Sequence, residues 1–216
     1  MRRKIWASAG LYAGAAAFFF LAFLPRGAGG VGNSLFKLLC CLLGAAAVGA
    51  AGWLRVRLFP GLKRRVARGS LWALFAVYLA FLGGLLFLDQ SYGRGTGWLL
   101  GFRGANWRPF ETIGFYLGRL PAGVAVVNLA GNLAAFAPMG LFLPLLFRKL
   151  DRWGWFLLTV GLSVALVELI QGATGLGACD VDDLILNLAG AAGAFGVCRL
   201  PPVKRGLVRL GLREDL

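Results

Sequence analysis

The sequence predicts an all-α integral membrane protein with about six transmembrane helices and with both termini in the cytoplasm. Of the 216 residues, 59% are hydrophobic and only 15% are charged. The mean hydropathy of +0.74 is far from that of a soluble globular domain. Apolar runs recur at the length that a helix needs to cross a bilayer, about 20 residues. The uneven distribution of basic residues between the connecting segments gives the orientation.

Six apolar runs are the candidate membrane-spanning helices. They cover about residues 5–24, 35–54, 70–88, 122–147, 153–172 and 183–199. The first follows a basic start, but it is longer than the apolar part of a signal peptide, about 7–15 residues, so we expect it to be retained. The fourth carries Pro138 in mid-span, where proline should kink or break the helix. The last should pack closely against other helices through its small residues, which are Gly190, Gly193 and Gly196 with Ala189 and Ala192.

Basic residues concentrate in alternate connections. They fill the N-terminus, the segment around Lys63, the segment around Lys149 and the C-terminal tail, whereas the other connections hold few. This positive-inside pattern assigns those segments to the cytoplasm. The net charge of +14 could also indicate nucleic-acid binding. The same distribution argues against a nucleic-acid partner and favours the anionic headgroups of the lipid bilayer.

Oxygen-bearing side chains interrupt the last three apolar runs in pairs that are three or four residues apart. The pairs are Asn128 and Asn132, Glu168 and Gln171, and Asp183 and Asn187. This spacing places each pair on one helix face, and the alternating direction of the helices places all of them in the outer half of the membrane. Such groups are costly in lipid unless they are paired or functional. We therefore expect them to converge, with Asp180 and Asp182 at the rim, in one polar pocket open to the outer face.

Structural roles are the alternative for each of these residues. Asp180 could cap the last helix, and Asp180 with Asp183 has the spacing of a capping box. The asparagines could hydrogen-bond between helices, and Glu168 could pair with an arginine such as Arg108. No residue is assigned a catalytic role, because the chain has no histidine and no motif specific to a reaction. The four cysteines do not suggest a disulfide framework.

The order and spacing of the polar motifs resemble the VanZ-like membrane protein family over about residues 70–199. The motifs are Asn106-x-x-Pro109-Phe110, Asn128-x-x-Gly131-Asn132-x-x-x-Phe136-x-Pro138-x-Gly140, Glu168-x-x-Gln171 and Asp180-Val181-Asp182-Asp183-x-x-x-Asn187-x-x-Gly190. The resemblance implies a multi-pass protein of the bacterial cytoplasmic membrane. It also implies a family named for a component linked to low-level teicoplanin resistance, without a settled biochemical activity.

One position departs from the family pattern. The family usually has an arginine three residues before the first aspartate of the last motif, and this chain has Gly177 there. If that arginine binds an anionic group or neutralises the carboxylates, the contact is lost or changed in this chain. Arg103 or Arg108 could replace it, and Arg108 is retained as a candidate for an anionic contact.

The chain divides into three parts on this basis. Residues 1–69 form a two-helix membrane extension with a basic cytoplasmic loop, residues 70–199 form the VanZ-like membrane domain, and residues 200–216 form a basic cytoplasmic tail. Residues 89–121 are expected to lie on the outer membrane surface, partly as an interfacial helix. Within them, Asn106–Phe110 should form a turn, because the residue before Pro109 favours extended geometry.

The sequence is compatible with four functions. The favoured one is recognition of a cell-envelope ligand, a lipid-linked precursor or a glycopeptide, with a contribution to teicoplanin or other glycopeptide resistance. Glu168, Asp182 and Asp183 are its first candidates. The alternative is a membrane-embedded enzyme acting on a lipid-linked headgroup. A transporter is less favoured, because the charges lie near one rim and no inverted repeat is visible, and a structural or assembly role is the fourth hypothesis.

A metal ion belongs to the enzyme hypothesis alone. Oxygen ligands suit Mg²⁺ or Ca²⁺, and the candidate ligands are Asp180, Asp182, Asp183 and Glu168. No cofactor is predicted otherwise, and no oligomeric state is predicted.

Overall fold

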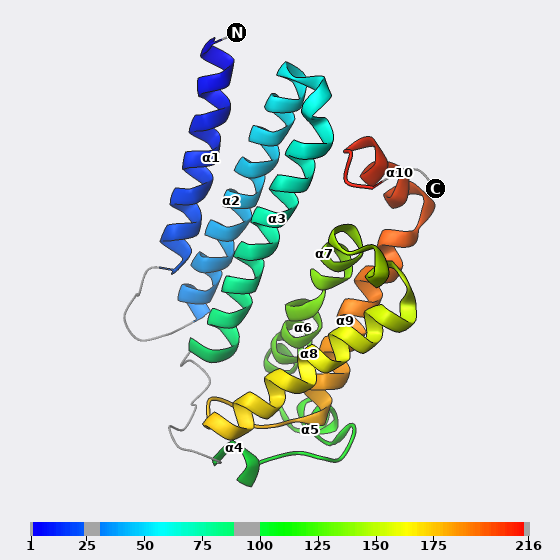
Figure 1. The fold of residues 1–216 in the computed structure, drawn as a ribbon. Helices are drawn as coiled ribbons and strands as arrows, with labels where there is room; N and C mark the ends of the chain where they lie inside the picture. Colours follow the sequence, from blue (N-terminus) through cyan, green and yellow to red (C-terminus); the bar gives the residue numbers. More distant parts are fainter. Residues whose placement is uncertain (1, 24–30, 89–99, 214–216) are drawn as a thin grey trace. The chain divides into compact units, whose positions relative to one another are not determined.

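The computed structural model describes residues 2–23, 31–88 and 100–213, and the regular secondary structure in these ranges is helical (Figure 1). The elements are α1 (Arg2–Phe23), α2 (Val31–Leu58), η1 (Pro60–Leu62), α3 (Lys63–Gly83), the π-helical η2 (Gly84–Leu88), α4 (Leu100–Arg103), α5 (Glu111–Arg119), α6 (Ala122–Phe136), α7 (Met139–Leu146), η4 (Arg148–Asp151), α8 (Trp153–Thr174), α9 (Val181–Arg199) and α10 (Pro201–Arg209). Within the described ranges there is no strand, so the prediction of an all-α fold is confirmed.

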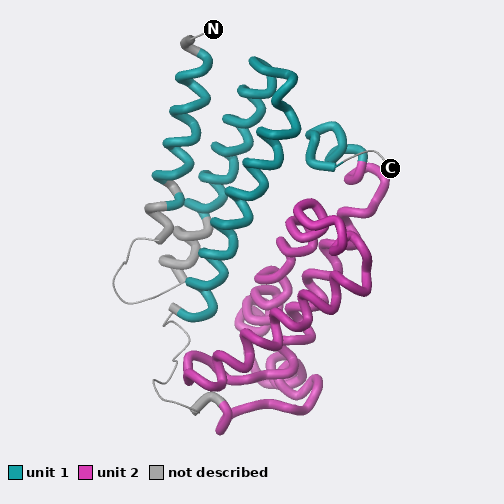
Figure 2. The backbone as a smooth tube through the Cα atoms, in the orientation of Figure 1, with its two compact units in different colours: residues 1–92, 205–216 teal, residues 93–204 magenta. Residues whose placement is uncertain are grey.

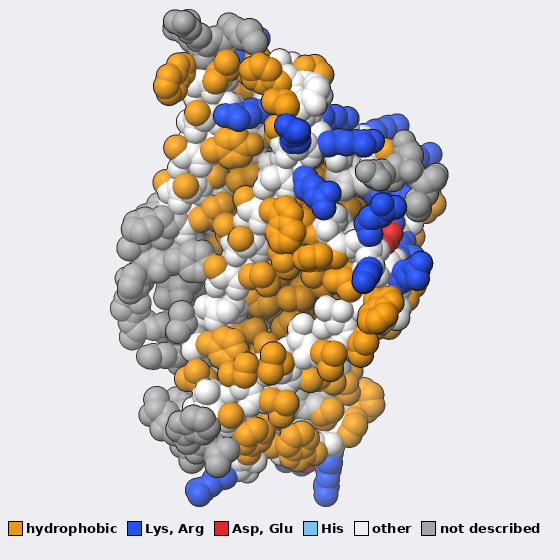
Figure 3. Space-filling view, viewed as in Figure 1, with side chains coloured by type: hydrophobic (Ala, Val, Ile, Leu, Met, Phe, Trp, Pro, Cys, Tyr) orange, Lys and Arg blue, Asp and Glu red, His pale blue; other side chains and the backbone are white. Residues whose placement is uncertain are grey.

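Five helical segments of the described chain are long and apolar enough to cross a membrane. They are Leu39–Leu58, Pro60–Phe87, Ala122–Leu146, Trp153–Thr174 and Val181–Arg199, and they correspond to the second to sixth predicted runs. The first predicted run lies in α1, whose side chains are described only in part. Hydrophobic side chains cover much of the visible surface, as expected for helices in lipid (Figure 3). The protein is therefore a multi-pass helical membrane protein, and the side on which its termini lie stays a prediction.

The chain forms two compact units (Figure 2). Unit 1 contains residues 1–92 and 205–216, and unit 2 contains residues 93–204. The family-like part predicted from the sequence, residues 70–199, begins inside unit 1, because α3 packs beside α2. The structure thus groups α3 with the two preceding helices, and the three-part division of the chain stays a prediction.

Unit 1 consists mainly of the long helices α1, α2 and α3 (Figure 1). Small residues let these helices approach: a Cβ on Gly44 would lie 2.5 Å from the Phe19 ring, and a Cβ on Gly52 would lie 3.4 Å from Ser70 Oγ. Ser8 is buried in α1, where it donates to the Ile5 carbonyl (2.8 Å) and accepts from Arg55 Nε (3.4 Å). The hydroxyl of Ser8 is thus satisfied by its own helix and by a partner on the next span.

Unit 2 is built around α8 and α9. Phe156 of α8 and Phe195 of α9 are buried and stack at 4.2 Å between ring centroids. Trp153 meets Phe195 edge to face at 4.5 Å. At the same end of α9, Arg199 forms an ion pair with Asp151 (3.1 Å). This aromatic and ionic packing holds the end of unit 2 that is opposite to the start of α9.

Pro138 interrupts the fourth predicted span, as the sequence indicates. Helix α6 ends at Phe136 and α7 begins at Met139. The backbone groups around the break remain bonded, since Gly140 N donates to Ala137 O (2.9 Å) and Leu141 N donates to Pro138 O (3.1 Å). The predicted break is confirmed, and both α6 and α7 pack against α9.

The glycine contacts of α9 differ in part from the prediction. A Cβ on Gly190 would lie 1.8 Å from the Leu133 carbonyl oxygen, so α6 and α9 touch backbone to backbone there. Gly193, by contrast, has open space around it, and a Cβ on Gly196 would meet only Trp153, at 3.9 Å. The expectation that all three glycines share one close-contact face is therefore wrong. The close approach of α7 uses Gly140 instead, whose Cβ would lie 2.5 Å from Ala191 O.

Candidate functional site

One end of unit 2 gathers the polar side chains, where α8 ends, α9 begins and α5 lies (Figure 1). We call the following residues the polar cluster. They are Asn106, Thr112, Asn132, Glu168, Asp180, Asp182 and Asp183, which hydrogen bonds join to one another or to the same short backbone segments. The predicted convergence of side chains from the last three spans is therefore present for Asn132, Glu168 and Asp183.

Asp180 caps α9 and binds two further side chains. It precedes the helix in extended geometry, and Asp182 N donates to its Oδ1 (2.8 Å). Asn106 Nδ2 also donates to Oδ1 (2.9 Å), and Thr112 Oγ1 donates to Oδ2 (2.6 Å). The capping role that the sequence offered as an alternative is thus confirmed. Both oxygens of Asp180 are engaged within the protein.

Asp182 is fully buried, at 0% exposure, and it holds the start of α5. Phe110 N donates to its Oδ1 (2.5 Å) and Ile113 N donates to its Oδ2 (3.0 Å). The first N–H groups of a helix have no partner within the helix, and a carboxylate at this end is favoured by the helix dipole. Asp182 therefore caps α5 from another helix, and both of its carboxylate oxygens accept hydrogen bonds within the protein.

Backbone pairing joins the segment before α5 to the segment before α9. Asn106 N donates to Cys179 O (2.9 Å), and Val181 N donates to Asn106 O (3.0 Å), which forms an isolated parallel bridge. The predicted turn follows, with Arg108 N donating to Asn106 Oδ1 (2.9 Å) and with Phe110 in the left-handed region at φ 67°. These contacts fix α5 against the first residues of α9.

Glu168 completes the cap of α9 from a different helix. It is only 6% exposed, and its Oε2 accepts from Asp180 N (3.0 Å). In a capping box, the side chain three residues into the helix makes this bond, so the expected partner was Asp183. That expectation is wrong. Asp183 instead accepts from Asn132 Nδ2 of α6 through its Oδ1.

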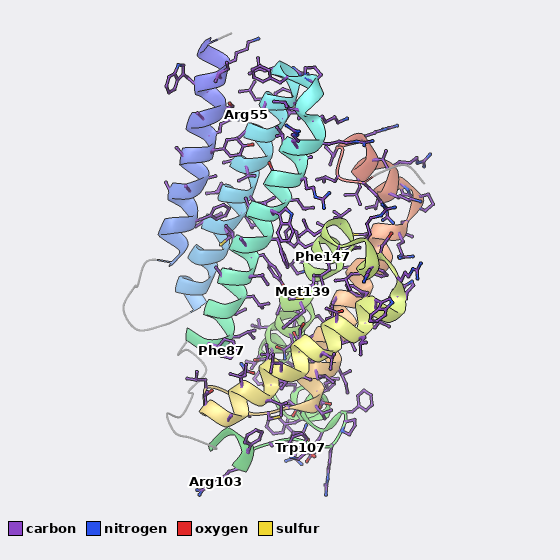
Figure 4. All side chains as sticks on the ribbon, viewed as in Figure 1. Arg55, Phe87, Arg103, Trp107, Met139 and Phe147 are labelled. Atoms are coloured by element: carbon purple, nitrogen blue, oxygen red, sulfur yellow. The ribbon has the colours of Figure 1, made fainter. Side chains whose placement is uncertain are left out.

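Glu168 and Asp183 each keep one oxygen outside this network. Among the described residues, no hydrogen bond reaches Glu168 Oε1 or Asp183 Oδ2, and no lysine or arginine forms an ion pair with either carboxylate. The expected alternative, a pair between Glu168 and Arg108, is therefore wrong. Arg108 is exposed, and the neighbouring Arg103 points away from unit 2 (Figure 4).

Asn187 lies one helical turn after Asp183 on α9. It is only 3% exposed, and its Oδ1 is buried without a hydrogen-bond partner in the described part of the chain. Buried polar atoms are normally bonded, so such an atom calls for an explanation. The third predicted pair, Asp183 and Asn187, thus provides two acceptor atoms that the fold itself leaves without a partner.

The remaining candidates are placed differently. Asn128 donates to Val124 O of its own helix (2.8 Å), so its amide group takes no part in the polar cluster. Gln171 is buried, and a Cβ on Gly177 would lie 3.1 Å from Gln171 Cδ. An arginine at position 177 would therefore require Gln171 to move, which gives a structural reason for glycine there.

Two members of the cluster were absent from the candidates drawn from the sequence. Asn106 was noted only as part of a motif, and Thr112 was not noted at all. Both bind Asp180 from a segment about seventy positions earlier in the chain. No local pattern marks Thr112, because its partner becomes a neighbour only when the loop before α9 folds against α5.

The acidic residues of the polar cluster were also the candidate ligands for a metal ion. Among the residues that the structure describes, no three His, Cys, Asp or Glu side chains are arranged to hold a metal ion. The cause is visible in the network, since Asp180 and Asp182 accept from N–H and O–H donors. This arrangement does not favour the Mg²⁺ or Ca²⁺ that the sequence left open.

Cys179 beside the cluster is not an activated nucleophile. It is a free, buried cysteine. Burial raises the pKa of its thiol, and the neighbouring Glu168 and Asp180 carboxylates raise it further. Reactive cysteines have a lowered pKa near positive charge, so this side chain stays a neutral thiol.

The fold and the polar cluster define a helical, multi-pass membrane protein with an acidic cluster at one end of its second unit. Comparison with protein families gives the family: residues 75–202 match the model of VanZ/LLP1. The match spans more than half of the chain and includes the whole polar cluster. The chain therefore belongs to the VanZ/LLP1 family, and the resemblance noted from its motifs is confirmed. Searches of curated proteins and of solved structures gave no significant match.

Proposed function

We propose that this VanZ-like protein recognises a cell-envelope ligand through Glu168, Asp183 and Asn187. The observation that carries the proposal is the uneven use of the acidic oxygens. The carboxylate oxygens of Asp180 and Asp182 all accept hydrogen bonds that hold α5 and α9 in place. By contrast, three acceptor atoms have no hydrogen-bond partner among the described residues: Glu168 Oε1, Asp183 Oδ2 and Asn187 Oδ1. Polar and ionisable groups within the spans of a membrane protein are costly and are candidates for function.

The chemistry of these atoms indicates which part of a ligand they would contact. Carboxylate and amide oxygens accept hydrogen bonds, so they suit the hydroxyl and amide N–H groups of a sugar or peptide. A phosphate group is less well suited, because no lysine or arginine of the described chain pairs with Glu168 or Asp183 and could balance its negative charge. A lipid-linked precursor or a glycopeptide carries such donors on its sugar and peptide parts.

The expected location follows from the charge pattern. The basic segments favour a cytoplasmic location for the opposite ends of these helices, which supports a polar cluster that faces outward from a bacterial cytoplasmic membrane. A ligand carried on or bound to the outer leaflet would reach it there. Contribution to teicoplanin or other glycopeptide resistance is the cellular consequence that this proposal expects.

The enzyme alternative receives less support. It would need carboxylates free to divide acid and base roles, and within the polar cluster only Glu168 and Asp183 retain an oxygen that accepts no hydrogen bond from the described residues. A transporter would favour charges near the membrane midplane, whereas Glu168 lies in the last third of α8 and Asp183 in the first turn of α9.

The test uses substitutions that keep the internal hydrogen bonds. In Glu168→Gln and Asp183→Asn, one oxygen can still accept from Asp180 N or Asn132 Nδ2, while the charge is removed. A hydrogen bond to a charged group contributes about 1.5–3 kcal/mol, so each variant should lower affinity about tenfold or more. We expect a bacterial host carrying either variant to lose teicoplanin protection at unchanged protein abundance.

The matched control is Glu111→Gln, which removes an exposed carboxylate from α5 at the same end of unit 2. It should retain the wild-type phenotype. Full protection by both Glu168→Gln and Asp183→Asn would refute the proposal.

A further inference from the structure

The end of unit 1 that carries the α2–α3 turn is strongly basic. Exposed arginines lie on both sides of the turn, with Lys63 half-buried between them. Among them are Arg57, Arg65 and Arg68. No aspartate or glutamate occurs before Asp89 in the chain. Lysine and arginine side chains stand out over this end of unit 1 (Figure 3).

The C-terminal segment adds to the same surface. Gly211 adopts φ 74°, which lets the chain turn after α10, and Leu212 N donates to Leu207 O (3.0 Å) across that turn. A Cβ on Gly211 would lie 3.3 Å from Lys63 Cγ, so the segment rests on the start of α3. Leu207 is buried, whereas Arg209 is exposed. Two parts of the chain that are far apart in sequence thus form one basic surface.

We infer that this composite surface, Arg57, Lys63, Arg65, Arg68 and Arg209, binds the headgroups of anionic phospholipids. Its position favours lipid over a soluble polyanion. The surface lies where one membrane-spanning segment ends at Leu58 and the next begins at Pro60. Clusters of four to eight basic residues at the ends of spans are typical of anionic-lipid recognition.

Aromatic residues support a location at headgroup depth. Trp53 and Trp72 are exposed, Trp53 about one and a half turns before the end of α2 and Trp72 about two and a half turns after the start of α3. Tryptophans at this depth form the aromatic belt of membrane proteins. Arg57 lies over the Trp53 ring, 4.0 Å from its centroid, so the charged group is held beside a ring of the belt. The arginine and the tryptophan would meet the same headgroup layer.

Native mass spectrometry of the full-length protein in a neutral detergent tests the inference. Phosphatidylglycerol and phosphatidylcholine are added at equal concentration, and the apparent affinity of each is measured. The wild-type protein should prefer phosphatidylglycerol. The double variant Arg65→Gln with Arg209→Gln should bind phosphatidylglycerol about tenfold more weakly than the wild-type protein, because one charge is lost from each segment. Each single variant should lose less than the double variant.

A double variant of unit 2, Arg103→Gln with Arg119→Gln, is the control, since both arginines are exposed and outside this surface. It removes the same charge and should retain the preference for phosphatidylglycerol. Equal losses in the two double variants would show an effect of net charge only and would overturn the inference. Absence of any headgroup preference would do the same. Displacement of the lipid by polyglutamate beyond the effect of salt at equal ionic strength would identify a soluble polyanion instead.

Discussion

At the scale of single residues, Gly190 sets the distance between α6 and α9. A Cβ there would lie 1.8 Å from the Leu133 carbonyl oxygen, which belongs to the backbone and cannot rotate away. The two helices also carry Asn132 and Asp183, whose hydrogen bond depends on the same close approach. The presence of glycine is therefore a condition for assembling the polar cluster.

We expect Gly190→Ala to lower the free energy of unfolding by about 1–3 kcal/mol, which is the usual cost of overpacking. Thermal unfolding in detergent measures the change. Gly193→Ala is the matched control on the same helix, because Gly193 has open space around it, and it should leave the unfolding midpoint unchanged or slightly higher. Equal midpoints for the two variants would contradict the backbone contact.

At the scale of elements, α5 depends on a carboxylate from another helix. Asp182 of α9 accepts from the N–H groups of Phe110 and Ile113, and none of the residues of α5 is buried. A nine-residue helix with so little packing is marginal by itself, since isolated helices shorter than about 12–15 residues are unstable in water. The hydrogen bonds to Asp182 and the backbone bridge at Asn106 therefore provide stability that α5 does not gain from buried side chains.

Asp182→Ala should therefore release α5 while the long helices stay folded. Two hydrogen bonds to a charged acceptor are lost, each about 1.5–3 kcal/mol. We expect faster hydrogen exchange across residues 104–119, measured by mass spectrometry, with little change in α8. Glu111→Ala, on the exposed face of α5, serves as the comparison. Unchanged exchange in Asp182→Ala would show that α5 is held by other contacts.

At the scale of the whole molecule, the orientation in the membrane rests on the basic segments. The α2–α3 turn is predicted to face the cytoplasm, and the segment before α5 is predicted to face outward. Arg65 and Arg108 are exposed representatives of these two regions. Three of the native cysteines are buried and Cys41 is half-buried, so labelling of the unmodified chain should be weak.

Cysteine labelling in intact cells tests this orientation. We expect a membrane-impermeant maleimide to label Arg108→Cys directly and to label Arg65→Cys only after the cells are permeabilised. The unmodified chain gives the background. The reverse pattern would place the polar cluster on the cytoplasmic side and would remove the basis for an outer-face ligand.

The sequence was sufficient wherever a feature depends on near neighbours. The apolar runs located the spans, Pro138 located the break between α6 and α7, and Asp180 could be assigned as a cap because it bonds to a residue two positions away. The role of Asp182 could not be read in this way, because its partners, Phe110 and Ile113, lie about seventy positions earlier.

Faces of helices were the other source of error. Spacing alone placed Gly190 and Gly193 on a common small-residue face, yet only Gly190 meets another helix. The period of a helix states which residues share a face but not which face a neighbour occupies. The same applies to Asn128 and Asn132, of which only the second reaches a carboxylate.

The size of the Phe110 side chain is explained by the surroundings of the protein and not by its interior packing. Its backbone adopts the left-handed geometry, which costs an L-residue about 1–2 kcal/mol and costs glycine almost nothing. The ring is 66% exposed, so interior packing does not explain its size. Exposed phenylalanine side chains of interfacial segments are stabilised at the boundary between headgroups and acyl chains. We therefore expect this ring to act as a small anchor in the lipid, which steadies the rim around the acidic residues without adding another span.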